Sequence, residues 1–202
     1  MACPSPPRWN NLKWAGKRLM RRTEGSAVLE FSITLPLLVV FVVGIYDFSG
    51  AFNQKQKIEQ AAQEGAIVAG AQPMSDIAPG TAGPGTGPGS LQPVVSAVFN
   101  SLTGSGVLAQ GACGAFIGFG PGPGLTWTYT SSCSGTFTDT LTITINRGWV
   151  SSTGPPPAVG TIVTVSYPYH WRFNSAIQLL FPGANYALQT SVTESATVHN
   201  QM

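Results

Sequence analysis

The stretch GSAVLEFSITLPLLVVFVVGIY, residues 25–46, decides how the rest of the chain is organised. Residues 31–46 contain no charged side chain, and small or apolar residues flank them on both sides. At 1.5 Å per residue, a helix over this region is roughly 40 Å long. The hydrocarbon core of a bilayer is about 30 Å thick, so such a helix is long enough to cross it. The stretch therefore predicts a transmembrane helix over about residues 28–50.

Two carboxylates bracket the apolar run, Glu30 near its start and Asp47 directly after its end. A charge at the centre of a bilayer costs at least about 2.5 kcal/mol. A Glu30 carboxylate below the interface therefore needs a partner, whereas Asp47 is expected to mark the membrane boundary.

Basic residues are concentrated before residue 25. Six of the ten Lys and Arg side chains lie there, against one acid, Glu24. Basic residues that flank an apolar span stay on the cytoplasmic side, which predicts a cytoplasmic N-terminus and an extracytoplasmic C-terminal part. Because the basic cluster precedes a span and has no basic counterpart later in the chain, we expect no nucleic-acid partner.

Composition and cysteine positions also favour an exported protein. Of the 202 residues, 9% are charged, while Gly and Pro number 24 and 16. Such a composition is typical of an exported chain with many turns. Cys3 lies in the basic leader, whereas Cys113 and Cys133 lie on the exported side. In an oxidising compartment we expect these two to form a disulfide, worth about 3 kcal/mol.

The helical pattern continues beyond the apolar run to about residue 72, where Pro73 ends it. Small or apolar residues form one stripe at helical spacing, namely Ile58, Ala61, Ala62, Gly65, Ala66 and Ala69. Pro36 removes one backbone hydrogen bond and is expected to bend the helix locally. Residues 73–93 are rich in Gly and Pro and are interpreted as a flexible spacer that does not pack.

Residues 94–202 predict a small β-rich domain. Val94, Val95, Val98 and Leu102 share one face of a short helix. Alternation of Thr or Ser with apolar residues predicts strands at 125–130, 136–146, 161–167 and 186–198. Residues 131–135 are expected to form a hairpin turn, 118–124 and 154–157 loops, and 173–181 a helical turn. The fold class is therefore α+β: a long membrane-spanning helix, then a three- or four-stranded antiparallel sheet with one or two short helices.

Catalytic and metal-binding patterns are missing from the sequence. It has two histidines, His170 and His199, few acids, and no Cys/His metal spacing. The aromatic cluster 167–171 around His170 is interpreted as surface aromatics at a strand end, and the Thr-rich strands as a solvated sheet face. We therefore expect no enzymatic activity, no metal and no cofactor.

Residues 25–30 have a property beyond anchoring. Cleavage after Gly25 removes the charged leader and leaves a new α-amino group on Ser26. If such helices stack in parallel, Glu30 of one subunit can meet the amine of its neighbour. An uncleaved signal anchor is the alternative, and a signal peptide cleaved after Ala51 is a weaker one, because the apolar run is long and Asp47 lies near that position.

These residues resemble the type IV prepilin class III pattern, and in particular TadE-like pseudopilins. The similarity rests on Glu30, the Leu35-Pro36 pair, Asp47 and the segment QAAQEGA at residues 60–66. A basic residue is usual in the family at the next position, where this chain has Ile67. The resemblance covers residues 21–72 and, more weakly, the C-terminal strands.

The resemblance implies a minor pseudopilin of a tight-adherence (type IVc, Tad/Flp) pilus. Residues 1–25 would be a leader that a prepilin peptidase removes, and Glu30, Phe31 and Pro36 would serve subunit assembly. The implied partners are other pilin subunits, the peptidase, the inner-membrane assembly platform and lipid. The implied location is the bacterial inner membrane, single-pass, and then an extracellular pilus. The runner-up is a signal-anchored, β-rich binding protein that is not cleaved at Gly25.

Overall fold

The computed structural model describes residues 24–77, 87–135, 137–150, 158–171, 173, 183 and 190–201. The chain divides into two compact units, an N-terminal unit of residues 1–44 and a sheet unit of residues 45–202. Helix α1, Glu24–Ala71, begins in the first unit and ends in the second. It continues through Pro36 and ends two residues before Pro73.

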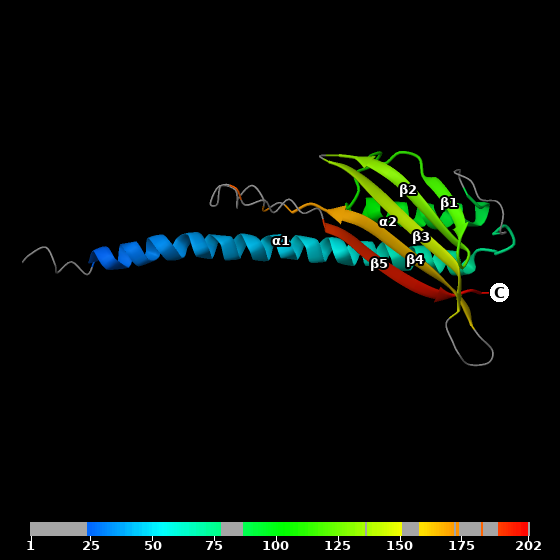
Figure 1. The fold of residues 1–202 in the computed structure, drawn as a ribbon, viewed down its shortest axis with the longest axis horizontal. Coiled ribbons are helices and arrows are strands. Elements are labelled where there is room, and N and C mark those ends of the chain that lie inside the picture. Colours follow the sequence, from blue (N-terminus) through cyan, green and yellow to red (C-terminus); the bar gives the residue numbers. More distant parts are fainter. Residues whose placement is uncertain are drawn as a thin grey trace, which may run out of the picture. The chain divides into compact units, whose positions relative to one another are not determined.

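The described residues of the sheet unit form five strands, which lie in the order β1-β2-β3-β4-β5 with all neighbours antiparallel (Figure 1). Their bounds are Ile117–Gly122, Thr126–Ser134, Thr138–Val150, Val159–Tyr169 and Thr190–His199. The expected α+β class with a long N-terminal helix is confirmed. Residues 125–130, 136–146 and 161–167 fall largely in β2, β3 and β4, so alternation predicted these strands correctly.

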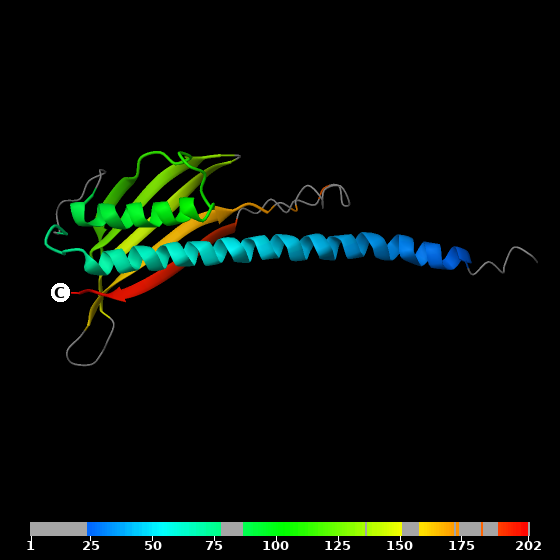
Figure 2. The same cartoon turned by 180° about the vertical axis from the view of Figure 1, so that it is seen from behind.

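Two helices cover one face of the sheet, namely α2, Gln92–Gly104, and the part of α1 that lies in the sheet unit (Figure 2). A 3-10 turn, Gly89–Leu91, precedes α2. The whole predicted stripe of α1 is buried in this core, as are the four predicted apolar residues of α2. The stripe consists mostly of small residues because α1 lies close to α2 and to the sheet. A Cβ on Gly65 would lie 2.5 Å from Val98 Cγ2.

Arg147 on β3 caps the C-terminal end of α1. Its Nη2 donates a hydrogen bond to the carbonyl of Gln72 at 2.8 Å, and its side chain is fully buried. The last turn of α1 has no basic residue of its own. A cation is favourable at this end, where the helix dipole is negative. Burial lowers the pKa of Arg147, and the nearby Asp76 carboxylate opposes that shift.

One predicted loop is a strand. Residues 118–124 were expected to be irregular because of their Gly and Pro content, but β1 occupies most of them. The prediction failed because glycine here serves close packing: a Cβ on Gly120 would lie 2.7 Å from Trp127 Cδ2. With β1 and a final strand, the sheet has five strands and not three or four. Cys133 lies within β2 and not in the following turn.

The spacer interpretation of residues 73–93 is wrong at both of its ends. Ile77 and Leu91 are buried in the core, and the Asp76 carboxylate accepts hydrogen bonds from Ser90 N–H and Oγ at 2.8 and 2.6 Å. Although burial opposes the shift, these bonds lower the pKa of Asp76. Residues 78–86, the expected loop 154–157 and most of the expected turn 173–181 lie outside the described residues, as does the leader up to residue 23.

Candidate functional site

The N-terminal unit exposes large apolar side chains along α1. Phe31 and Phe41 are each 64% exposed, and Ile45, at the start of the sheet unit, is 70% exposed. In the described part of the chain, α1 is the one helix long and apolar enough to cross a membrane. This helix fits a single-pass membrane protein, because exposed side chains of this kind are stable in lipid or against other apolar helices.

The predicted processing and assembly residues lie together at the start of this helix. Ser26 and Glu30 are both exposed, and Ser26 Oγ lies one turn from the carboxylate, 3.5 Å from Glu30 Oε1. Phe31 and Pro36 are also exposed on the helix, and nothing lies within 4 Å of a Cβ built on Gly25. The Glu30 carboxylate is therefore accessible to a second chain.

Asp47 lies in a buried polar junction. Only 3% of the residue is exposed. Its Oδ1 accepts a hydrogen bond from the Tyr169 hydroxyl at 2.9 Å, and its Oδ2 accepts one from Phe173 N–H at 3.1 Å. Gly50 makes room for this contact, since a Cβ there would lie 2.8 Å from Tyr169 Oη. Asp47 thus ties α1 to the end of β4, and its expected place at the membrane boundary stays a prediction.

The aromatic residues after β4 belong to the same junction. The ring of Trp171 packs edge to face on the rings of Tyr169 and Phe48, with ring centroids 5.1 Å and 5.4 Å apart. Trp171 Nε1 donates to Thr190 Oγ1 at 2.9 Å. The interpretation of these residues as surface aromatics is therefore wrong for Tyr169, which is buried. Edge-to-face pairs contribute about 0.5–1.5 kcal/mol each beyond their buried area.

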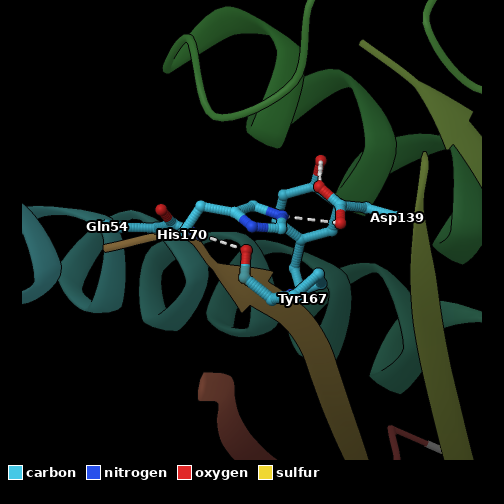
Figure 3. A network of polar contacts seen from close by, with 5 residues as sticks. Gln54, Asp139, Tyr167 and His170 are labelled. Atoms are coloured by element: carbon cyan, nitrogen blue, oxygen red, sulfur yellow. Dashed lines mark hydrogen bonds and ion pairs between the residues drawn. The ribbon is translucent and has the colours of Figure 1, made fainter. Parts of the chain in front are cut away.

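His170 belongs to a neighbouring polar network (Figure 3). Its Nε2 lies 2.7 Å from Asp139 Oδ1, and the Tyr167 hydroxyl donates to Asp139 Oδ2 at 3.3 Å. Phe137 stacks on the imidazole with ring centroids 4.0 Å apart. Burial, and then the adjacent Asp139 carboxylate, raise the pKa of Tyr167 to about 12. Gln54 on α1 donates to the carbonyl of Pro168 at 3.2 Å, which joins the helix to this strand end.

An open groove of about 590 Å³ borders the network. Gln54, Phe137, Tyr167 and His170 line it, together with the chain around Val107. A histidine paired with a carboxylate can position or move a proton, but catalysis by a triad also needs a nucleophile on the other ring nitrogen. Among the described residues no such contact occurs, and none of them form a group of three or more metal-ligating side chains.

The structure joins Cys113 and Cys133 by a disulfide, which is consistent with the predicted pair. The bond links the segment before β1 to β2, and Ser134 N–H donates to the carbonyl of Ala112 beside it. The crosslink therefore ties the chain that borders the groove to the sheet.

Comparison with known proteins gives one result. Residues 25–66 match the family model described as TadE-like protein. This segment of the chain is TadE-like. The match begins at Gly25, includes Glu30 and Asp47, and ends before α2 and the sheet, so the resemblance seen in the sequence is confirmed for the helix. It points to a protein associated with the Tad pilus. No curated protein and no solved structure matches the chain.

Proposed function

We propose that the chain is a minor pilin of a type IVc (Tad/Flp) pilus, which primes or caps a fibre used in adhesion or secretion. One observation carries the proposal. The TadE-like segment begins at Gly25, and its first half is the part of α1 whose large apolar side chains are exposed. A helix of this kind serves first as a membrane anchor and then as a packing surface for other pilin helices.

Processing after Gly25 would give Glu30 its partner. The Ser26 hydroxyl is one turn away, so the new α-amino group on Ser26 would lie at the same end of the helix. In a bundle of parallel helices, the amine of one subunit and the Glu30 carboxylate of its neighbour would form a charge-assisted hydrogen bond. An unpaired carboxylate in such a bundle would be costly, which makes the pair a condition of assembly.

The proposed partners follow from this role. They are a prepilin peptidase, other pilin subunits, the inner-membrane assembly platform and membrane lipid. The protein would be inserted once in the bacterial inner membrane with its leader in the cytoplasm and the sheet unit outside. Its contribution would be structural and not enzymatic.

The first test is the mature N-terminus. Mass analysis of protein extracted from membranes of cells that contain the peptidase should find a chain that begins at Ser26. A chain that begins at Met1 would contradict the proposal and favour the uncleaved signal anchor. A chain that begins at Phe52 would contradict it in favour of an ordinary signal peptide.

The second test separates assembly from insertion. Glu30→Ala should leave membrane localisation and processing intact but weaken co-purification with partner pilins, and Glu30→Asp should be intermediate because its carboxylate reaches less far. Glu59→Ala is the matched control, since Glu59 is an exposed glutamate on the same helix and accepts a hydrogen bond from Gln63 one turn later. Normal assembly of Glu30→Ala would show that the amine-carboxylate pair is not used.

A further inference from the structure

The two edges of the sheet are built differently. In the part of the chain that the structure describes, the strand order leaves one side of β1 and one side of β5 without a neighbouring strand. An unpaired edge presents a row of free N–H and C=O groups, and proteins protect such edges with proline, bulges, lysine or short strands. β1 has these protections. It is six residues long, has a bulge between Phe119 and Gly122, and contains Pro121, which has no N–H.

β5 lies at the other edge of the sheet (Figure 1) and has no proline, lysine or bulge. It is ten residues long and pairs with β4 in unbroken register from Thr190 to His199. It contains no proline, glycine or lysine. Within the described part of the chain, no main-chain hydrogen bond reaches residues 191–199 from any element other than β4. From Ser191 to Thr197, the outer side of β5 is therefore a regular row of backbone groups that no main-chain hydrogen bond from the described residues reaches. At the end of the strand α1 lies close, since a Cβ on Gly70 would lie 3.2 Å from the His199 carbonyl oxygen.

The side chains of β5 keep charge away from its solvent face. Glu194 turns toward α1, where its Oε1 lies 3.4 Å from Lys55 Nζ. The alternate residues are exposed and include no Asp, Glu, Lys or Arg. They are Ser191, Thr193, Ser195, Thr197 and His199. The one carboxylate of the strand is thus paired within the chain.

We propose that the free edge of β5 binds an extended, uncharged segment of another protein, which joins the sheet as a sixth strand. A regular row of alternating donors and acceptors is satisfied as a whole only by another extended backbone. Because the exposed row of β5 offers hydroxyl groups and no charge along its length, it favours a segment rich in Thr, Ser and Val.

A second copy of β5 does not fit this edge. Lys55 contacts Glu194, and a Cβ on Gly70 would lie 3.0 Å from Val198 Cγ1, so α1 and β5 run in the same direction. Two identical edges pair symmetrically in the antiparallel sense. Such a pair would point residues 45–71 of the two α1 helices in opposite directions, whereas the proposed fibre, on which this step rests, packs its subunits with these helices parallel. The occupant is therefore an unlike segment.

A peptide titration tests the edge directly. The probe is a fluorescein-labelled peptide of sequence TIVTVSY, residues 161–167, which is the β4 segment that pairs with β5 from its other side. Fluorescence anisotropy with the full chain in mild detergent should show saturable binding. The double variant Thr193→Lys/Ser195→Lys should weaken it about tenfold or more, because a lysine on an edge strand opposes strand addition.

Thr142→Lys/Thr144→Lys is the matched control. Thr142 and Thr144 lie on β3 in the same cross-strand rows as Thr193 and Ser195, so the control adds the same charge to the same face of a central strand. The control variant should bind the peptide with the same affinity as the parent chain. If the β5 double variant unfolds at a lower temperature than the parent, Ser195→Lys alone replaces it.

Three results would overturn the inference: no saturable binding, equal loss in both double variants, or a dimer of the parent chain that the β5 variant dissociates. Each is separate from the proposed function. A mature N-terminus at Ser26 together with an unreactive β5 edge would leave the pilin role standing and remove only the added strand.

Discussion

The two halves of α1 reverse the usual relation between side-chain size and burial. In residues 28–46, most Val, Leu, Ile and Phe side chains are 40–70% exposed, while in residues 58–69 the buried positions are mainly Ala and Gly. The second half has a neighbour inside its own chain, so small residues let α2 and the sheet approach. In the first half most large side chains are exposed among the described residues, which suits them to lipid or to helices of other subunits. One helix therefore combines a surface that is packed within its own chain with an apolar surface that is exposed.

The largest expected difference between the halves comes from truncating one apolar side chain in each. Ile58 is fully buried and Leu38 is 61% exposed. Ile58→Ala should lower the free energy of unfolding of the sheet unit by about 3 kcal/mol, because it leaves a cavity. Leu38→Ala should change it by less than about 0.5 kcal/mol. Urea unfolding of the full chain in mild detergent, followed by near-ultraviolet circular dichroism, measures both. Equal effects would show that the two halves are not distinct.

Replacing a glycine by a larger residue should also destabilise the second half of α1 more than the first, but by a smaller amount of unfolding free energy. Gly65→Val places a methyl-bearing carbon against Val98 and should cost about 2 kcal/mol through overpacking. Gly44→Val is the control, since nothing lies within 4 Å of a Cβ at Gly44. The comparison would fail if Gly44→Val destabilised the sheet unit as much as Gly65→Val does.

The carboxylates at the ends of the apolar run should also differ. Asp47→Asn should lower the free energy of unfolding by about 1–2 kcal/mol, because an amide cannot accept both hydrogen bonds that the buried carboxylate accepts. Glu30→Gln should have no effect on unfolding, since Glu30 is exposed. A stable Asp47→Asn protein with altered membrane insertion would instead assign Asp47 to the membrane boundary.

A further expected difference is a dependence on alkaline pH that arises from Tyr167 in the sheet unit. The pKa of Tyr167 is raised from 10.0 to about 12 by burial and by Asp139, so folding favours its protonated form. Its contribution to stability is therefore complete below pH 10 and is lost as the pH rises towards 12. Tyr167→Phe should reduce the loss of unfolding free energy between pH 10 and 12. If the free energy of unfolding falls equally with pH in the parent and in Tyr167→Phe, Tyr167 has the same pKa in the folded and the unfolded state.

The sequence alone determined the features that depend on local periodicity. Three patterns were visible in the sequence: an uncharged run long enough for a bilayer, a stripe at helical spacing, and alternating Thr residues. Each pattern indicates that one side of a helix or strand faces a uniform environment, such as lipid, a core or water. The residues from Gly25 to Asp47 that define the TadE-like segment were visible for the same reason, because they are close together in the chain.

Only the tertiary structure decided the contacts between distant residues. Asp47 and Tyr169 are separated by 122 positions, and Arg147 reaches Gln72 across 75. His170 follows β4 and Asp139 lies on β3, and Gly120 of β1 lies against Trp127 of β2. Each of these contacts joins single residues, and the sequence around one of them does not indicate which distant residue is its partner. The role of each residue depends on which element folds beside it, and this is set by strand order and helix packing and not by the residues next to it in sequence.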